Sequence, residues 1–434
     1  MMKKIVSILI VAVAVMLITI TAYGAEPNRT LAQDYGINDY SIAYFDNNKI
    51  TYENYGYGID ENSVFELASN GKVVSAYIAL ELVDEGKISL EDRIAPFLDS
   101  DLLTDDKRLT EITLKQLLCH TAGFSPSFEL GVDKKIYSNP GEQFCYSGVG
   151  YIYLQNVIEN VSGMTIEQAA KHYVFEPLGM NNSTFEYAKT VTPYINLSSV
   201  ALYTFTVFII TFIVLFSIAF VIGRITKFKF YSLKIGLFVC FVMASIINTL
   251  FLLFVFVSKV VVIFVIYFVL AGLFLLFTKK HNKLFYSCIP VLTIVVFALG
   301  FTIQSSMPVT NDLIPKEANS AYTLKSTSKD MSIFCKELMQ QYNSDNGTIK
   351  DMFSVAVNID DVNSWGLGIA IESESDGETY WHSGINPGFQ SLFVLYPLQD
   401  KYVVILTNSD NGLTFSKDIA KSFLGINGYW DIKR

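Results

Sequence analysis

The sequence predicts an α+β fold with one antiparallel sheet, a helical part and a four-helix transmembrane insertion. Strand-like segments occur near both ends of the chain with helical segments between them, so the first and last strands are expected to share one sheet. A strongly apolar block interrupts two segments of ordinary globular composition. We divide the chain into a signal peptide or N-terminal anchor (1–24), the first part of a globular domain (28–196), four transmembrane helices (199–304) and the second part of that domain (306–434).

Apolar periodicity and turn residues divide the globular segments further. Two short runs rich in aromatic and β-branched residues, 41–45 and 49–55, flank Asp46-Asn47-Asn48 and predict a hairpin. Helical patterns follow over residues 69–85, 114–118, 151–161 and 165–174. Beyond the apolar block, the sequence predicts a helix over 326–342, strands over 366–372, 390–395 and 402–406, and a closing helix over 413–424.

The N-terminus has the composition of an export signal. Met1-Met2-Lys3-Lys4 is a basic start, Ile5–Ala22 is apolar, and small residues follow up to Ala25. This order predicts a secretory signal that is cut after Gly24. Because the apolar run is long for a signal, the alternative is an uncleaved anchor. In both cases the segment that follows is expected to be exported.

Four successive apolar stretches contain no charged residue: Val200–Gly223, Ile235–Ser258, Val260–Thr278 and Leu284–Ile303. Each is close to the ~20 residues that a helix needs to cross a bilayer. Lysine and arginine gather in the first and third connections, which predicts that both flanks of the block lie outside. The expected location is a bacterial cell membrane, crossed several times and with membrane lipid as a partner. Charge-free stretches favour an anchor or assembly role over transport.

Composition and motifs argue against several classes of function. The net charge is −9 and no Lys/Arg cluster lies outside the membrane-flanking loops, so nucleic acid is not an expected partner. The five cysteines lack C-x-x-C spacing and predict neither a metal site nor a disulfide framework. The chain contains no H-E-x-x-H and no G-x-S-x-G. No metal or cofactor is expected, and His120 is expected to be a structural residue of its loop.

One pair of residues predicts nucleophilic chemistry. Ser69 and Lys72 lie three residues apart at the start of a predicted helix, so their side chains share a face. Free N–H groups at a helix N-terminus can stabilise an oxyanion, and burial favours a neutral lysine that can take the serine proton. A second such pair, Ser326 and Lys329, begins a helix with a charged face, whereas the helix after Ser69 is apolar. Only the first pair is a candidate site.

The segment around the first pair reads Phe65-Glu66-Leu67-Ala68-Ser69-Asn70-Gly71-Lys72. Further motif-like segments follow at 86–92, 112–123, 140–147, 177–180 and 382–389. Together, and in this order, they resemble class C β-lactamases and D-alanyl-D-alanine carboxypeptidases, a family of penicillin-binding-protein-like serine hydrolases. The resemblance covers about Ser41–Phe185 and Asn319–Asn408, and it implies a β-lactamase/transpeptidase-like fold.

The resemblance implies catalytic roles by position. Ser69 would be the acylated nucleophile, Lys72 would activate it, and Tyr146 would relay protons to and from the leaving group. The tyrosine motif of the family ends in Asn, whereas this chain has Gly148 at that place. An Asn amide could hold Lys72 and the substrate amide, and losing such a contact in a desolvated site costs about 1–3 kcal/mol.

The resemblance also implies a substrate-binding strand. His382, Ser383 and Gly384 match the third motif of the family, so their strand would line the cleft and present polar side chains to a substrate carboxylate. The backbone N–H groups of Ser69 and Ile385 would form the oxyanion hole.

The expected function is a membrane-anchored serine hydrolase that acts through an acyl-enzyme at the outer face of the cell membrane. Its substrates would be D-Ala-D-Ala-type peptides of peptidoglycan, β-lactams or related small amides and esters. The alternative is a non-catalytic or slowly turning over receptor for β-lactams or peptidoglycan fragments that signals through the membrane helices. Gly148 favours the receptor slightly, and the intact Ser69, Lys72 and Tyr146 favour the enzyme.

Overall fold

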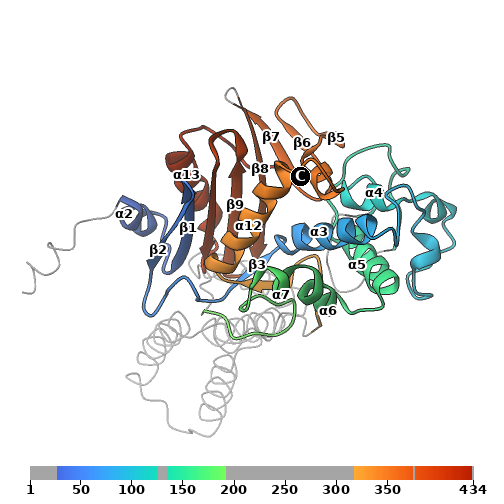
Figure 1. Ribbon diagram of the computed structural model, residues 1–434, viewed down its shortest axis with the longest axis horizontal. Coiled ribbons are helices and arrows are strands. Elements are labelled where there is room, and N and C mark those ends of the chain that lie inside the picture. The colour runs from blue at the N-terminus through green and yellow to red at the C-terminus, as the bar shows by residue number, and fades with distance from the viewer. Residues whose placement is uncertain (1–26, 126–133, 192–316, 375–376, 433–434) are drawn as a thin grey trace, which may run out of the picture. The chain divides into compact units, whose positions relative to one another are not determined.

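An eight-stranded antiparallel sheet in the order β2-β1-β10-β9-β8-β7-β6-β5 organises the computed structural model (Figure 1). Its strands are β1 (Tyr40–Asp46), β2 (Lys49–Tyr55), β5 (Val357–Asn358), β6 (Asn363–Trp365), β7 (Ala370–Glu374), β8 (Gly377–Asn386), β9 (Phe389–Tyr396) and β10 (Lys401–Thr407). A separate two-stranded sheet pairs β3 (Phe65–Ala68) with β4 (Leu324–Ser326). The structure describes residues 27–125, 134–191, 317–374 and 377–432.

The N-terminal hairpin and the last strand lie side by side, as the sequence predicts. β1 pairs with β2 on one edge and with β10 on the other, so that Ile42 lies opposite Ile405. Asn47 and Asn48 turn the hairpin with φ of 51° and 58°, values that a two-residue turn between twisted strands requires and that Asn tolerates. The expectation that the first and last strands share one sheet is confirmed.

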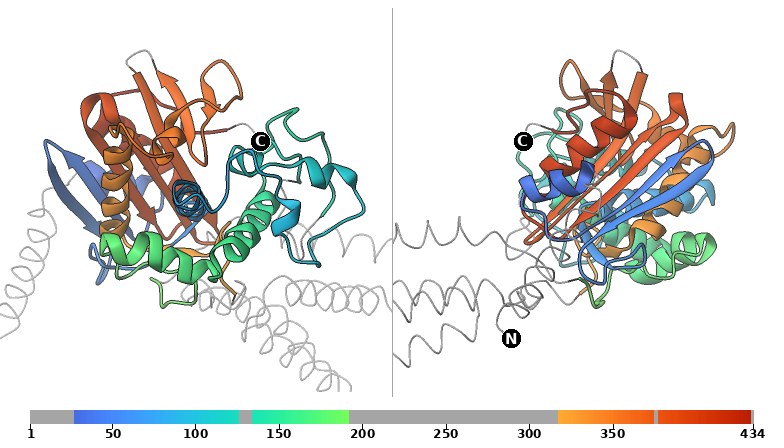
Figure 2. Two further views of the ribbon diagram at one scale, coloured as in Figure 1. Left: turned by 45° about the vertical axis from the view of Figure 1, so that its right-hand side comes forward. Right: turned by 90° about the vertical axis from the view of Figure 1, so that its left-hand side faces the viewer.

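Both faces of the sheet are covered because its central strands are apolar on both sides. Along β10, Tyr402 and Val404 belong to one hydrophobic core, whereas Val403 and Ile405 belong to the other. Helix α12 (Ser328–Tyr342) packs on the first face, and α13 (Gly412–Leu424) covers the second together with α2 (Pro27–Asp34) (Figure 2). The sheet is therefore the middle layer of three.

The remaining helices form the helical part beside the first face. They are α3 (Gly71–Asp84), α4 (Leu114–Leu118), α5 (Gly148–Ser162), α6 (Ile166–Ala170) and α7 (Glu176–Leu178), with single turns at Ala95–Phe97, Lys107–Glu111, Lys171–Phe175, Ile349–Phe353 and Pro397–Gln399. Helix α3 packs against α5 and α6. It has no charged residue from Val73 to Leu80 and is buried along that stretch, as expected for a helix apolar on every side.

The structure corrects two predicted boundaries. The strand expected over 366–372 is a turn followed by β7, because the chain reverses at Gly368 with a φ of +93°. The helix expected from Ser326 starts at Ser328, because Ser326 belongs to β4 and the Thr327 side chain caps the helix by accepting the N–H of Asp330 at 3.0 Å.

The membrane prediction is also corrected. No helix within the described ranges combines the length and the apolar composition that a bilayer crossing requires. We therefore withdraw the four-helix transmembrane insertion and the multi-pass membrane location. The four stretches on which that prediction rested fall in 192–316, outside the described residues, as do residues 1–26 with the predicted signal.

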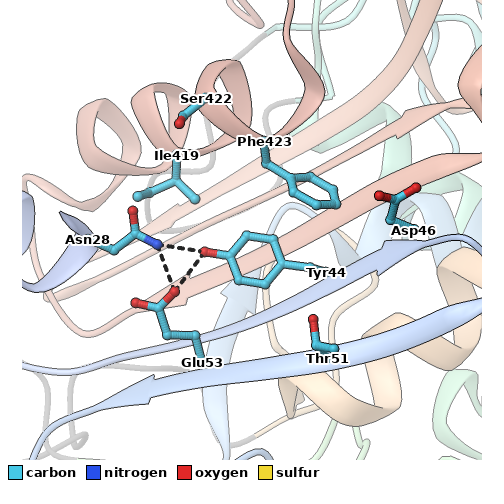
Figure 3. Close-up of a pocket in the computed structure, with 8 residues that line it drawn as sticks. All are labelled: Asn28, Tyr44, Asp46, Thr51, Glu53, Ile419, Ser422 and Phe423. Atoms are coloured by element: carbon cyan, nitrogen blue, oxygen red, sulfur yellow. Dashed lines mark hydrogen bonds between the residues drawn. The ribbon is translucent and has the colours of Figure 1, made fainter. Parts of the chain in front are cut away.

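A hollow on the α13 face is lined by α2, β1, β2 and α13 (Figure 3). Its polar groups are bonded to one another: the Asn28 amide donates to Tyr44 Oη at 2.9 Å and to Glu53 Oε2 at 2.7 Å, and Tyr44 Oη donates to Glu53 Oε2 at 3.1 Å. These bonds fasten α2 to the hairpin. None of the lining residues comes from β3, α3 or β8, so the hollow is separate from the candidate site.

Candidate active site

Ser69 lies between the short strand β3 and the N-terminus of α3. Ala68, the last residue of β3, has a φ of +48°, a left-handed conformation that an alanine rarely adopts. The turn is closed by Asn70 N–H, which donates to Leu67 O at 3.1 Å, and by Lys72 N–H, which donates to Ser69 O at 3.0 Å. Such local strain persists only where the surroundings fix it, and it is common at functional sites.

Ser69 and Lys72 are in contact. Lys72 Nζ donates to Ser69 Oγ at 3.0 Å and to the carbonyl oxygen of Ala321 at 2.7 Å, and the lysine side chain is fully buried. The ammonium position also lies 5.1 Å from the ring centroid of Tyr146 and 5.7 Å from that of Tyr151. The predicted pair therefore forms inside a desolvated pocket with aromatic walls.

Tyr146 lies at the end of the loop that leads into α5. The next residue, Ser147, caps this helix: its Oγ accepts the N–H of Gly150 at 3.0 Å and donates to Ser125 O at 2.5 Å. Tyr146 is half-buried, and its ring lies near both Lys72 Nζ and the ring of His382. Gly148, which stands where the family has Asn, is the first residue of α5.

The strand β8 carries the predicted substrate residues. The ring of His382 is buried and its centroid lies 6.1 Å from that of Tyr146. Gly384 allows β8 to approach β3, because a Cβ atom there would lie 1.9 Å from Leu67 O. Ser383 is half-buried and Ile385 is 49% exposed. The structure thus brings Ser69, Lys72, Tyr146 and His382 together. The catalytic and binding roles of these residues, and those of Ser383, Gly384 and Ile385, stay predictions.

Buried polar side chains behind the nucleophile were missed by the sequence analysis. The Asn70 amide donates to Ser391 Oγ at 2.9 Å, and that hydroxyl donates to Leu67 O at 3.1 Å. These two bonds fix the turn before α3 against β9. No local pattern signals them, because Ser391 lies 321 positions from Asn70.

A second tether joins β3 to the end of β8. The Asn386 amide donates to Glu66 Oε2 at 2.9 Å and to Tyr322 O at 3.2 Å. Burial raises the pKa of Glu66, and this effect outweighs the opposing hydrogen bond from Asn386 and the positive charge of Lys325. Asn386 is therefore committed to β3 and to the segment that holds Lys72.

The second Ser-x-x-Lys pair does not form a site. Ser326 is buried in β4, where its hydroxyl shares a 2.8 Å hydrogen bond with that of Ser183. Lys329 is exposed and its Nζ donates to Asn62 Oδ1 at 3.4 Å. The contrast that the sequence predicts between the two pairs is confirmed.

The sequence of this chain matches a protein-family model and several curated proteins. A family model described as Beta-lactamase matches residues 25–194 and 301–422. Penicillin-binding protein 4 of Amycolatopsis lactamdurans is 27% identical over 143 residues, which are 30% of this chain and 38% of that protein. A Salmonella typhimurium protein named "Putative D-alanyl-D-alanine carboxypeptidase" is 28% identical over 148 residues, or 29% of this chain and 34% of that protein. The matches span about a third of the length of these curated relatives.

Solved structures share the fold. A penicillin-binding protein homologue from Pyrococcus abyssi, described as octameric, superposes with a TM-score of 0.57 at 17% identity, covering 92% of this chain and 76% of that chain. A D-stereospecific amidohydrolase from Streptomyces sp. gives a TM-score of 0.57 at 16% identity over 92% of this chain and 99% of that chain. At these identities the likeness concerns the fold, and it agrees with the predicted β-lactamase/transpeptidase-like α+β architecture.

Proposed function

Because the chain belongs to the beta-lactamase family, we propose that it is a serine hydrolase that forms an acyl-enzyme on Ser69 and releases it to water. One observation carries the proposal: the buried Lys72 Nζ lies 3.0 Å from Ser69 Oγ, within reach of the proton that must leave the hydroxyl. The lysine that touches the nucleophile is itself held by a backbone carbonyl, so the pair is pre-positioned.

The proposed reaction has two halves. Ser69 Oγ attacks the substrate carbonyl while its proton moves to neutral Lys72, and the oxyanion that forms is stabilised by the N–H groups of Ser69 and Ile385. Tyr146 then gives a proton to the leaving amine or alcohol as the carbonyl bond to it breaks, and it takes the proton back from Lys72, so that both groups return to their starting states. In the second half a water molecule loses a proton to neutral Lys72 and attacks the acyl carbonyl, and that proton passes to Ser69 Oγ as it leaves.

The proposed substrates are D-Ala-D-Ala-type peptides, β-lactams or related amides and esters. The names of the relatives, which include penicillin-binding and carboxypeptidase proteins, support this class. The ring of His382 supplies a polar group near Tyr146, and half-buried Ser383 follows it on β8; both would suit a substrate carboxylate. Gly148 favours a second candidate, a protein that is acylated but turns over slowly, because it lacks the amide that would orient the substrate beside the base.

Intact-mass spectrometry of the full chain with a fluorescent penicillin and with an acyl-D-Ala ester tests the proposal. We expect one acyl adduct that is absent in Ser69→Ala and present in Ser326→Ala, which removes the serine of the unsuitable pair. Adduct formation in Ser69→Ala would contradict the assignment of the nucleophile. Repeated release of product from the ester identifies an enzyme, whereas a single equivalent of product with a persistent adduct identifies the slow acyl acceptor.

A further inference from the structure

His120 holds the backbone on both sides of Tyr146. The N–H of Cys145 donates to the carbonyl oxygen of His120 at 2.8 Å, and the N–H of Ser147 donates to its ring Nδ1 at 3.1 Å. Tyr146 is thus flanked by two residues that are both hydrogen-bonded to the same histidine. These bonds restrict the peptide units that set the direction of the tyrosine side chain.

The imidazole also packs directly on the tyrosine. The ring centroids of His120 and Tyr146 lie 4.5 Å apart, the shortest of four ring contacts that the histidine makes. Tyr151 at 5.0 Å, Trp365 at 4.9 Å and Phe144 at 5.9 Å surround the same imidazole. With only 2% of its surface exposed, His120 leaves the tyrosine ring little freedom on that side.

The backbone of His120 is itself in a rarely used conformation. Its φ is +57°, in the left-handed region that costs about 1–2 kcal/mol for a residue other than glycine. His and Asn reach this region more readily than most residues. This turn after α4 brings both the carbonyl oxygen and the ring of one residue to the Tyr146 loop.

Burial keeps the histidine neutral. It is the largest cause that holds the pKa of His120 well below its usual range, and a proton on Lys72 or on His382 lowers that pKa further. Tyr146 and Tyr151 are the other titratable groups packed on the ring. A neutral imidazole whose Nδ1 accepts an N–H carries its proton on Nε2, so the bond to Ser147 is retained.

We propose that His120 is a positioning residue that fixes the hydroxyl of Tyr146 for proton transfer to the leaving group. The inference rests on the proposed function and deepens it. It replaces the purely structural role expected from the sequence, because the histidine contacts the loop of the reacting side chain at three points rather than filling space in a core. It acts only through Tyr146 and does not touch the substrate.

Two substitutions of His120 distinguish a role in positioning Tyr146 from a role in filling space. His120→Asn retains an acceptor, since Asn Oδ1 occupies the place of His Nδ1 one bond from Cγ, and Asn tolerates the positive φ. His120→Ala removes both the acceptor and the ring. His172→Ala is the matched control, because exposed His172 also packs on a tyrosine, Tyr173 at 4.7 Å, but is not in contact with the site residues.

The experiment is a double-mutant cycle between His120→Ala and Tyr146→Phe, with kcat and KM measured on an acyl-D-Ala ester. We expect His120→Ala to lower kcat about 100-fold with KM nearly unchanged, since misplacing a reacting group costs about that much. In the Tyr146→Phe background the same change should cost less than about threefold, because there is no hydroxyl left to position. His120→Asn should recover most of the loss, and His172→Ala should equal the wild type.

Other outcomes would contradict either the positioning role of His120 or the proposed role of Tyr146. Losses that multiply in the double mutant, or equal losses in His120→Asn and His120→Ala, would overturn the positioning role. A Tyr146→Phe variant with wild-type kcat would contradict the proposed role of Tyr146 and the present inference with it. Thermal unfolding of each variant detects misfolding, and a variant that unfolds is replaced in the cycle by His120→Asn, whose additivity with Tyr146→Phe decides the question.

Discussion

The carbonyl oxygen of Ala321 accepts a hydrogen bond from Lys72 Nζ at 2.7 Å, although the two residues lie 249 positions apart in the chain. Ala321 belongs to the segment that leads into β4, and β4 pairs with β3 immediately before Ser69. The second part of the domain therefore contributes directly to the orientation of the base. Neither part of the chain contains the complete candidate site.

Replacing the lysine tests its role as a base. Lys72→Arg keeps a long basic side chain, but an arginine stays protonated and cannot take the proton of Ser69 as a neutral lysine would. We expect acylation by a fluorescent penicillin to slow at least about 100-fold, the lower end of what general base catalysis contributes. Lys329→Arg, in the exposed second pair, should be labelled at the wild-type rate. Labelling of Lys72→Arg at that same rate would rule out a base role.

The contact between β8 and β3 predicts an intolerance to side chains at one position. In Gly384→Ala the new Cβ would lie 1.9 Å from Leu67 O, so the strand that carries the proposed oxyanion donor, Ile385, must shift. We expect a loss of about 1–3 kcal/mol in the free energy of unfolding together with slower acylation. Gly150→Ala in α5 is the control, because its Cβ would meet only ordinary contacts beyond 3.5 Å, the nearest at 3.6 Å. Urea unfolding gives the free energy of unfolding of both variants and of the wild type. A Gly384→Ala variant as stable as Gly150→Ala would contradict the prediction.

Gly148 predicts a preference among substrates. We expect acylation to occur without an Asn side chain, but amide turnover should suffer more than turnover of activated esters, whose leaving groups need less help. We expect esterase activity to exceed β-lactamase activity, and Gly148→Asn to raise amide hydrolysis about tenfold, equivalent to about 1.4 kcal/mol in the barrier.

The structure weakens one alternative to this prediction, in which a neighbouring polar group already replaces the missing Asn. Ser147 Oγ is engaged in capping α5, and the Asn386 amide donates to Glu66 and Tyr322. Values of kcat/KM for the wild type and Gly148→Asn on a matched ester and amide decide whether the missing Asn limits turnover or is already replaced. If Gly148→Asn lowers both, the glycine is no deficit and the larger side chain only crowds the cleft.

Buried neutral His120 predicts a dependence of stability on pH. Its folded-state pKa is lowered, so below the usual value of about 6.5 the unfolded state binds a proton that the folded state does not. The resulting contribution to stability is present above pH 6.5 and declines as the pH falls, by up to about 1.4 kcal/mol per pH unit. His120→Asn should lose less stability than the wild type between pH 7.5 and 5.5. Urea unfolding at several pH values gives the free energy of unfolding of both proteins. If it falls equally with pH in the wild type and in His120→Asn, His120 is not the group responsible.

Local features of the sequence were sufficient for much of the fold. Asn47 and Asn48 predict the hairpin because a tight turn needs positive φ at both positions, and the structure has it. The periodic apolar segments predict α3, α4, α13 and β10 closely, since helix and strand repeats are set by neighbours in sequence. The membrane insertion was inferred from hydropathy alone, and the described part of the chain gave it no support.

The sequence by itself predicted the contact between Ser69 and Lys72, because residues three apart at the start of an apolar, buried helix can share a face. The same spacing at Ser326 and Lys329 gives no such contact. It also predicted which of the two lysines is buried, Lys72 rather than Lys329, since burial follows the apolar composition of the helix. Only the tertiary structure decided that Ala321 holds the lysine, that Asn386 ties β8 to Glu66 and that His120 supports Tyr146. These bonds join positions far apart in the chain, and such pairs become neighbours only after the sheet and the helical part have packed together.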